Sequence, residues 1–352
     1  MVGLIRFAQQ HLRGARLSPH RTLRLIAESQ DYVRGGTQKD TYGPDEVMEV
    51  RCPLCASENR ERLYTEHGAI GISRCSGCSL IYTSPRIHSP EQVYWGDASI
   101  YHEEARLIFE GKAAHHRDPN YLSEIRAIER YRKAGRFLDV GCNMGMLLRL
   151  AVKRGWNCVG LEPSPKLAEL AKKHGFPVWN CFMHEVPESE NASFDVVALS
   201  DVFEHIAEPC SFLRQATRLL KPDGLLYVKV PNARWTIFKQ KILGLVGKRP
   251  RQGLWDSYEH VVHYTDRTLK KILTEGGFRV LAISTEAPIQ TPNWHEYVGH
   301  YYQYPTPWFM DIKRKAVRTT FYRLSSVERQ LRLGSLGYFA QNVVAIAQKS
   351  GG

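Results

Sequence analysis

The stretch FLDVGCNMG at residues 137–145 decides the fold of this 352-residue chain. A short apolar strand that ends at Asp139 leads into a turn with Gly141, Asn143 and Gly145, and a segment of helical period follows. Such a turn brings the backbone close to a ligand at the point where a helix begins. Alone the turn is a weak signal, because glycine turns of this kind occur in many α/β proteins.

The residues that follow the turn strengthen the signal. A second apolar run at 157–161 ends at Glu162, where a carboxylate can accept both hydroxyls of a ribose. The order strand, glycine turn, helix, strand, acid predicts a site for a nucleoside or dinucleotide.

Short continuous apolar runs alternate with helical segments through the second half of the chain. This alternation is typical of a parallel sheet covered on both faces. We therefore expect an α/β fold with a Rossmann-like, doubly wound, mostly parallel seven-stranded sheet. The expected strands lie at 137–140, 157–161, 178–181, 195–199, 225–230, 278–284 and 341–347, with helices at 144–154, 166–174 and 210–220.

Four of the eight cysteines form two close pairs upstream of this region, Cys52 with Cys55 and Cys75 with Cys78. The spacing C-x2-C-x19-C-x2-C suits a zinc ribbon, in which each pair supplies two thiolates to one tetrahedral ion. Four protein ligands leave no place for water, so we expect a structural rather than a catalytic zinc. The alternative is a set of buried or redox-active cysteines.

The chain is long enough for one large α/β domain and a smaller module. Its 43% hydrophobic content argues against wholesale disorder. The segments that we expect are a basic arm at 1–48, the zinc ribbon at 49–85, a helical connector at 86–135, and the α/β domain at 136–352 with insertions at 232–258 and 287–337. Long insertions in a compact domain tend to be lids or docking surfaces.

Charge and cysteine usage bear on location and partners. No apolar run is long enough to span a bilayer and the remaining cysteines are scattered singly, which predicts a cytoplasmic protein. The net charge of +12 is concentrated in basic stretches at 1–39, 231–255 and 313–332. These are either solvated helix faces or surfaces for an anionic partner. One stretch, 234–247, has apolar residues at helical spacing and is interpreted as a lid helix or, alternatively, a membrane-surface helix.

Five segments resemble the class I S-adenosylmethionine-dependent methyltransferases, especially the group typified by ubiquinone-biosynthesis O-methyltransferases. The matching pieces are FLDVGCNMG, VGLEPSPKLAELAKKHG, FDVVALSDVFEHIAEP, LLKPDGLLYVKVPN and LKKILTEGGFRV, and the resemblance covers about residues 120–285. Their order and spacing make the resemblance specific. One departure is Asn143, where the family more often has glycine.

The resemblance implies S-adenosylmethionine as the cofactor and assigns roles by position. The turn at 141–145 and Asp139 would line the methionine end, and Glu162 would hold the ribose. Met183, or its neighbours Phe182 and His184, would border the adenine, although core packing explains these side chains equally well. Ser200 and Asp201 follow the fourth strand, where family members contact the methionine moiety and the substrate.

Methyl transfer from a sulfonium requires alignment of the nucleophile and, for a hydroxyl, help with loss of its proton. Histidine titrates near neutrality and suits this role. The candidates are His263, the first choice, then His205 and Asp201, with Glu204 and His260 nearby; a structural role is an equal alternative for His263.

The predicted function is a methyltransferase acting on a small molecule, with a sugar nucleotide or glycan as one hypothesis, because sugar methyltransferases with an N-terminal zinc module have a similar layout. One alternative is an RNA methyltransferase that uses the ribbon and basic stretches. Another is a non-catalytic zinc-ribbon binding protein. The sequence leaves the oligomeric state open.

Overall fold

The computed structural model describes residues 41–88, 99–112, 114–245, 247, 253–288, 297–298, 308–331 and 337–350. Most of the expected basic arm, residues 1–40, lies outside these ranges. So do residues 89–98 of the expected helical connector.

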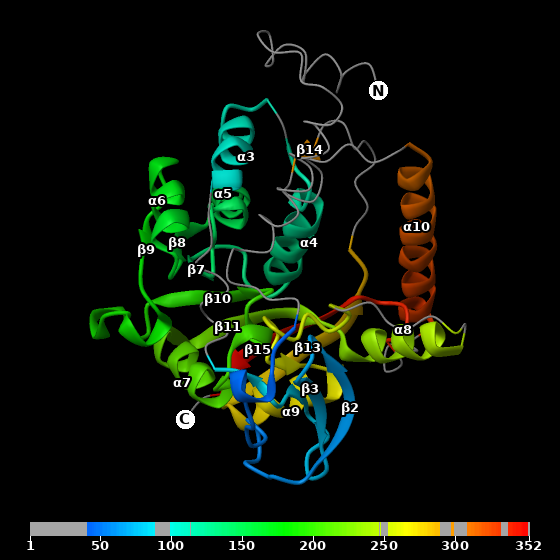
Figure 1. Ribbon diagram of the computed structural model, residues 1–352. Coiled ribbons are helices and arrows are strands. Elements are labelled where there is room, and N and C mark those ends of the chain that lie inside the picture. Colours follow the sequence, from blue (N-terminus) through cyan, green and yellow to red (C-terminus); the bar gives the residue numbers. More distant parts are fainter. Residues whose placement is uncertain are drawn as a thin grey trace.

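A seven-stranded sheet forms the centre of the molecule, in the order β13-β15-β11-β10-β7-β8-β9 (Figure 1). Its strands are β7 (Arg136–Val140), β8 (Asn157–Leu161), β9 (Val178–Trp179), β10 (Phe194–Ser200), β11 (Leu220–Pro231), β13 (Phe278–Glu286) and β15 (Asn342–Lys349). Only β15 runs antiparallel to its neighbours, β11 and β13. The predicted Rossmann-like, mostly parallel sheet is confirmed.

Helices cover both faces of the sheet because each buries one apolar side. One face carries α4 (Asp118–Glu129), α5 (Met146–Lys153) and α6 (Pro165–Lys173), and the other carries α7 (Pro209–Leu219) and α9 (Asp266–Glu275) (Figure 1). Leu148 of α5 and Leu213 of α7 are fully buried in the two separate cores that result.

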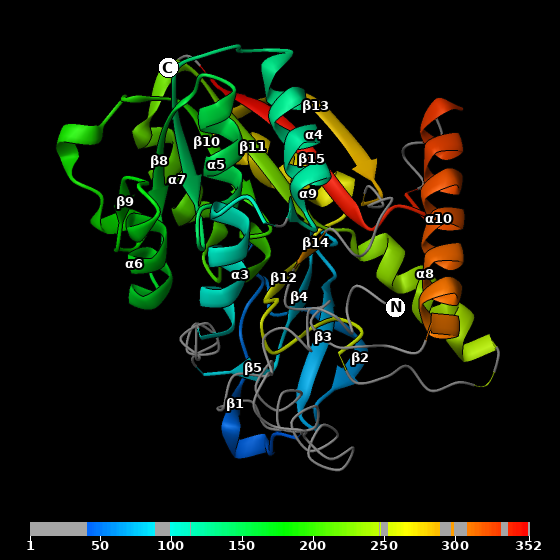
Figure 2. The same ribbon diagram turned by 90° about the horizontal axis from the view of Figure 1, so that it is seen from above.

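The cysteine-rich region forms a second sheet of four strands, in the order β12-β4-β3-β2. Its strands are β2 (Arg60–Glu66), β3 (Ile70–Cys75), β4 (Ile81–Thr83) and β12 (Val262–His263). We call residues 49–85 the metal-binding module. Its outer strand β4 pairs with β12, which comes from the second half of the chain (Figure 2). The module also shares a hydrophobic core with α7 and α9 through Cys78, Leu80 and Tyr82.

The remaining elements lie outside these two sheets. They are β1 (Val47–Met48), β5 (Arg86–Ile87), α3 (Ser99–Phe109), β6 (Ala114–His115), α8 (Ala233–Leu245), β14 (Tyr297–Val298), α10 (Trp308–Gln330) and the 3-10 turns η1 (Pro44–Glu46), η3 (Met183–Glu185), η4 (Glu188–Glu190) and η5 (Phe203–His205). The described part of the segment at 86–135 therefore contains the helices α3 and α4 and also the short strands β5 and β6. Among these elements, β1 pairs with β5 and β14 with β6.

The expected helix at 234–247 is α8, which lies beside α10 (Figures 1 and 2). Its first half packs on the body, since Trp235 contacts Phe321 with ring centroids 4.7 Å apart and Phe238 contacts Tyr338 at 5.6 Å. Its second half exposes Leu245 by 84%. Only the first half of the apolar stripe is therefore covered by the rest of the chain that the structure describes.

The third strand is shorter than expected. It ends at Trp179, and Asn180 turns away because its side-chain amide donates to the carbonyl oxygens of Glu162 and Pro163, each at 2.9 Å. This amide joins the loops that follow two neighbouring strands.

Candidate cofactor and acceptor sites

The strand order of the central sheet reverses between β7 and β10, and ligands bind at such a point, outside the carboxyl ends of the strands. Asp139 and Gly141 lie at the end of β7, and Glu162 follows β8. Ser200 ends β10, with Asp201 next to it. The fold thus brings the predicted cofactor residues to one edge of the sheet.

The turn after β7 needs residues that accept positive φ angles. Gly141 has φ of 69°, and a β-carbon there would lie 2.7 Å from the Val202 side chain. Asn143 has φ of 51°, and its Oδ1 accepts the N–H of Met144 at 2.6 Å. Asparagine tolerates this region and bonds its own turn, so the departure from glycine at 143 preserves the loop conformation.

Glu162 is tied to this turn. It is 8% exposed, and its two carboxylate oxygens accept the backbone N–H groups of Asn143 and Ser164, each at 2.9 Å. Burial raises its pKa, and the two backbone hydrogen bonds oppose that rise. The carboxylate is therefore held in one orientation between the turn and the start of α6.

Asp139, at the end of β7, is 3% exposed. We call the region outside the carboxyl ends of β7, β8 and β10 the cofactor crevice, after the place where such sheets bind ligands. Burial raises the pKa of Asp139 well above the usual value, and the nearby carboxylates of Glu124 and Glu162 raise it further. A cluster of buried acids disfavours negative charge and favours a positively charged ligand.

Ser200 and Asp201 belong to a buried ionic network. Lys229 of β11 is 6% exposed, and its Nζ lies 2.6 Å from Glu124 Oε1 and 3.1 Å from Asp201 Oδ2. Ser200 donates to Glu124 Oε2 at 2.8 Å, and Arg117 forms an ion pair with Asp201. Two cations, Arg117 and Lys229, thus lie next to the Asp201 carboxylate and compensate its charge.

Met183 lies in η3 after β9 and is 3% exposed, in the core that includes Val186 and Phe194. Phe182 is 39% exposed beside it. Contact of these residues with an adenine stays a prediction.

A cavity of about 70 Å³ is lined by Pro231, which ends β11, and by Glu204, which lies in the segment that follows β10. Its polar lining comes from Glu204 of η5 and from Asp256, His260 and His263. Trp255 adds a wall, with its ring 5.0 Å from that of His263 and perpendicular to it. We call this cavity the acceptor pocket.

Burial shifts the pKa values of the polar groups of this pocket toward their neutral forms, most strongly for Glu204 and the two histidines. It raises the pKa of Glu204 to about 8 and, with the charge of Glu66, that of Asp256 to about 6. It lowers the pKa of His260 to about 4 and that of His263 well below the usual value. Imidazoles at neutral pH are thus unprotonated and able to accept a proton.

His205 is half-buried and does not itself line the pocket. Its Nδ1 lies 3.2 Å from the carbonyl oxygen of Glu259, so Nδ1 carries the proton. Ligand atoms of Glu204, His205 and His260 lie within 4.8 Å of one another, as do those of Glu104, His115 and His116 near α3. Both sets have donor types that divalent metals use.

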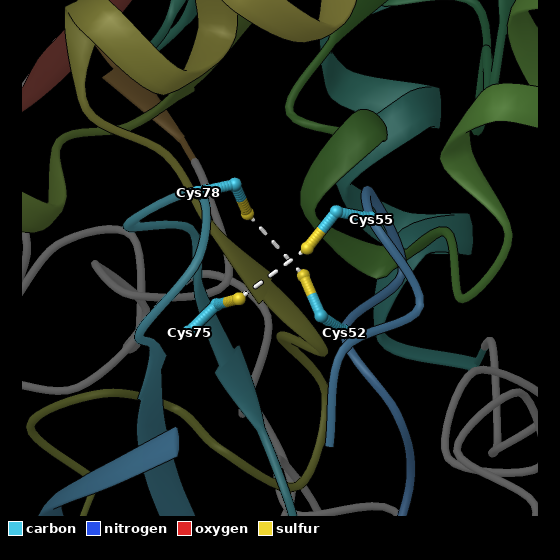
Figure 3. Close-up of side chains that lie close together, drawn as sticks. All are labelled: Cys52, Cys55, Cys75 and Cys78. Carbon is cyan, nitrogen blue, oxygen red and sulfur yellow. Dashed lines mark hydrogen bonds between the residues drawn. The ribbon is translucent and has the colours of Figure 1, made fainter. Parts of the chain in front are cut away.

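The four cysteines of the metal-binding module point their sulfur atoms at one another (Figure 3). The Sγ atoms of Cys52 and Cys78 are 3.4 Å apart, as are those of Cys55 and Cys75. Zinc–sulfur bonds of about 2.3 Å in a tetrahedron require sulfur atoms roughly 3.8 Å apart, so a zinc ion fits with small adjustments. Burial raises the pKa of the Cys52 thiol to about 11, and a thiolate there calls for a cation.

The two cysteine turns share one geometry. Ala56 and Ser79 each follow a second cysteine with positive φ, 58° and 64°, and each donates its N–H to the carbonyl oxygen of the first cysteine of its pair. This repeated turn suits a closed four-thiolate site and leaves the ion no open position.

The metal-binding module reaches the acceptor pocket at two places. Thr83 donates its hydroxyl to the carbonyl oxygen of His260 at 2.7 Å and lies 3.1 Å from His263 Nε2. Glu66, 2% exposed, accepts the backbone N–H groups of Trp255 at 2.9 Å and Ser257 at 3.4 Å. The pocket wall is thus fixed by groups that lie far earlier in the chain.

Comparison with known proteins agrees with the strand order and the turn. Residues 113–283 match the sequence model of the family described as "Methyltransferase domain". This part of the chain is a class I methyltransferase domain. The predicted resemblance is confirmed, and the crevice and the pocket belong to the methyltransferase domain and the strands next to it.

The methyltransferase domain is similar to curated ubiquinone-biosynthesis O-methyltransferases. The protein from Rhodopseudomonas palustris (strain TIE-1) is 30% identical over 115 residues, which cover 31% of this chain and 45% of that protein. The protein from Xanthomonas oryzae pv. oryzae (strain PXO99A) is 30% identical over 140 residues, which cover 38% of this chain and 58% of that protein. The chain thus spans about half the length of these curated relatives.

Solved structures also align with the methyltransferase domain. An S-adenosylmethionine-dependent methyltransferase from Archaeoglobus fulgidus is 18% identical, with a TM-score of 0.44 over 69% of this chain and 99% of that one. The 1,6-didemethyltoxoflavin-N1-methyltransferase from Burkholderia thailandensis is 13% identical, with a TM-score of 0.43 over 82% of this chain and 99% of that one. The order of the strands in the central sheet defines the fold independently of these TM-scores.

The sequence analysis did not predict several residues of the cofactor site and the acceptor pocket. Lys229 carried a signal, because a lysine inside the apolar run 225–230 needs a buried partner. Glu124, Thr83 and Asp256 carried none, since nothing in their local sequence shows what they face.

Among the helices in the described ranges, none is long and apolar enough to cross a bilayer.

Proposed function

We propose that this protein transfers a methyl group from S-adenosylmethionine to a hydroxyl group of a small molecule. One observation carries the proposal: the candidate cofactor site and the acceptor pocket both lie at the carboxyl ends of strands of the central sheet. In this proposal the cofactor binds at the turn at 141–145 and Glu162, and the acceptor binds in the pocket lined by Glu204, after β10, and by Pro231, at the end of β11.

The cofactor roles follow from the geometry of the crevice. Glu162, held by two backbone N–H groups, is oriented to accept the ribose hydroxyls. Asp139 and Gly141 border the methionine end, which carries the positive sulfonium and ammonium charges that buried acids favour. Asp201, next to Ser200, anchors the same end and does not act as a base, because Lys229 and Arg117 neutralise it.

The acceptor site takes a neutral group, because Glu204, His260 and His263 on its wall are neutral near pH 7. His263 is the base in this proposal, with an unprotonated imidazole on the pocket wall. His205 supports the pocket wall through its ring contact with His260. The two curated relatives described above are named O-methyltransferases, which favours a hydroxyl acceptor. We take a sugar nucleotide or glycan as the first acceptor class to test.

The metal-binding module would hold a structural zinc through Cys52, Cys55, Cys75 and Cys78. In this proposal the module and the domain at 136–352 act as one unit, since β4 and β12 share a sheet. The ion supplies rigidity there and takes no part in methyl transfer, because four thiolates complete its coordination.

Native mass spectrometry with S-adenosylmethionine and S-adenosylhomocysteine tests the first half of the proposal. We expect one zinc and one cofactor per chain. A screen with S-adenosylmethionine labelled in its methyl group then compares sugar nucleotides, phenols and RNA as acceptors. Zinc without cofactor binding would refute the proposal and leave a binding protein. Labelled RNA, with affinity that falls steeply as salt increases, would replace the small molecule with a nucleic acid.

The exposed end of α8 supports one additional contact. Ile242 and Leu245 are 45% and 84% exposed, and the neighbouring Lys239 and Lys241 are exposed bases. Such a surface suits an anionic membrane that presents a lipid-linked acceptor. Co-sedimentation with vesicles containing anionic lipid tests this contact. The variant Leu245→Ser should bind less, and equal sedimentation of the two proteins would exclude it.

A further inference from the structure

Thr83 of the metal-binding module lies between two histidines of the acceptor pocket. Its side chain is fully buried, with Oγ1 2.7 Å from the carbonyl oxygen of His260 and 3.1 Å from Nε2 of His263. The contact joins positions 180 residues apart in the sequence. It exists because β4, which ends at Thr83, pairs with β12, which ends at His263.

The proton positions in this contact follow from elementary rules. A carbonyl oxygen accepts hydrogen bonds and cannot donate them, and a threonine hydroxyl has one proton. The Thr83 proton therefore points to the carbonyl oxygen of His260. Oγ1 then meets His263 Nε2 as an acceptor, so Nε2 must carry a hydrogen.

Before reaction His263 is a neutral imidazole. The residue is 7% exposed, and burial together with the neighbouring His260 lowers its pKa well below the usual value. A neutral imidazole has one N–H. With that hydrogen on Nε2, the unshared electron pair lies on Nδ1, which takes part in none of the hydrogen bonds found among the described residues.

The backbone that carries His260 and His263 is held from the other side as well. The N–H of His260 donates to the carbonyl oxygen of Asp256 at 2.8 Å, and that of Val261 to the carbonyl oxygen of Glu204 at 2.9 Å. The Trp255 ring stands edge-on to the imidazole of His263. The imidazole plane is thus fixed by packing, and Thr83 determines which nitrogen is protonated.

We infer that Thr83 is a positioning residue that holds His263 in the Nε2–H tautomer, so that Nδ1 is the atom that receives the proton of the acceptor hydroxyl. The inference rests on the proposed function for its chemical step. In that step the acceptor oxygen forms a bond to the methyl carbon while the carbon–sulfur bond breaks and leaves its electron pair on sulfur. The hydroxyl proton passes to Nδ1 and afterwards to solvent.

Two variants of Thr83 separate positioning from mere packing. Thr83→Val keeps the shape of the side chain and removes the hydroxyl, and Thr83→Ser keeps the hydroxyl. Long-range proton–nitrogen spectra of full-length protein labelled with ¹⁵N-histidine report the tautomer directly, and His263→Gln identifies the signals. We expect the Nε2–H pattern in the wild type and in Thr83→Ser, and its loss or a mixture of tautomers in Thr83→Val.

Kinetics with any acceptor found in the screen adds a second readout. General base catalysis contributes roughly 10²–10⁴-fold, so kcat of Thr83→Val should fall at least about tenfold and that of Thr83→Ser should stay within about threefold. The KM for S-adenosylmethionine and the zinc content should not change. Unchanged kcat in Thr83→Val would contradict the inference.

The spectra decide the inference even if no acceptor is methylated. An Nδ1–H tautomer in the wild type overturns it, and so does an Nε2–H tautomer that persists in Thr83→Val. If Thr83→Val does not fold, the tautomer seen in the wild type and in Thr83→Ser still supports or overturns the inference. Failure of the proposed function has a different signature, namely the expected tautomer in a protein that binds no cofactor.

Discussion

Replacement of Glu204 by glutamine should change how the stability of this protein depends on pH. Glu204 is 2% exposed, and its Oε2 has no hydrogen-bond partner among the described residues. Burial raises its pKa from 4.5 to about 8. Between these values the folded state holds a proton that the unfolded state has released, so folding becomes less favourable as pH rises.

The size of the effect follows from the shift. One pKa unit corresponds to about 1.4 kcal/mol. Integration between about pH 6 and pH 8.5 gives a loss of roughly 2 to 3 kcal/mol of unfolding free energy in the wild type. Glutamine cannot ionise, so Glu204→Gln should lose that much less over the same interval. The interval lies above the range in which the pocket histidines would take up protons.

Urea unfolding at about pH 6 and pH 8.5 measures the difference, with zinc present throughout. Glu169→Gln on the exposed side of α6 is the matched control, since it removes a carboxylate that is exposed rather than buried. It should follow the wild type. If the wild type and Glu204→Gln show parallel pH dependence, Glu204 does not ionise in this interval and its assignment as a neutral pocket wall is wrong.

Three other changes test the remaining parts of the site. Glu162→Ala should weaken S-adenosylhomocysteine binding at least tenfold by calorimetry without loss of zinc, and an unchanged affinity would remove Glu162 from the ribose. Cys55→Ser should lose zinc and acceptor methylation but retain cofactor binding, because β7 to β10 do not belong to the metal-binding module. Loss of cofactor binding together with methylation would contradict that separation. Lys229→Met should lower the unfolding free energy by about 3 to 5 kcal/mol, since it leaves buried Glu124 without its cation. The double variant with Glu124→Leu should recover part of this loss in urea melts, and additive losses would argue against a coupled pair.

The central sheet was predictable because its strands are buried on both faces. Such strands are continuous apolar runs, and the glycine turn and Glu162 mark which strand ends form the crevice. The cysteine spacing likewise predicted, without reference to the fold, that these four cysteines lie together. In each case the pattern is local, because the residues that form it are close neighbours in the sequence.

The acceptor pocket could not be predicted in the same way. It depends on β12, a strand of two residues, which is too short to show any periodicity. Thr83 and Glu66 matter only because β4 lies against that strand, and their own neighbourhoods contain no sign of it. Lys229 was visible as a charge in an apolar run, but its partners Glu124 and Asp201 come from distant positions that only the folded chain brings together.

In the proposed function, the pairing of β4 with β12 also divides the work of the chain between two parts. Cofactor binding would depend on the region from β7 to β10, whereas the shape of the acceptor pocket depends on the surface that the metal-binding module offers. Substitutions in β4 and at Glu66 can therefore alter the choice of acceptor without disturbing methyl donation. Descendants of one ancestral gene would diversify their substrates by changing the module, and a transplanted module would carry substrate preference with it only if its edge strand still accepts β12.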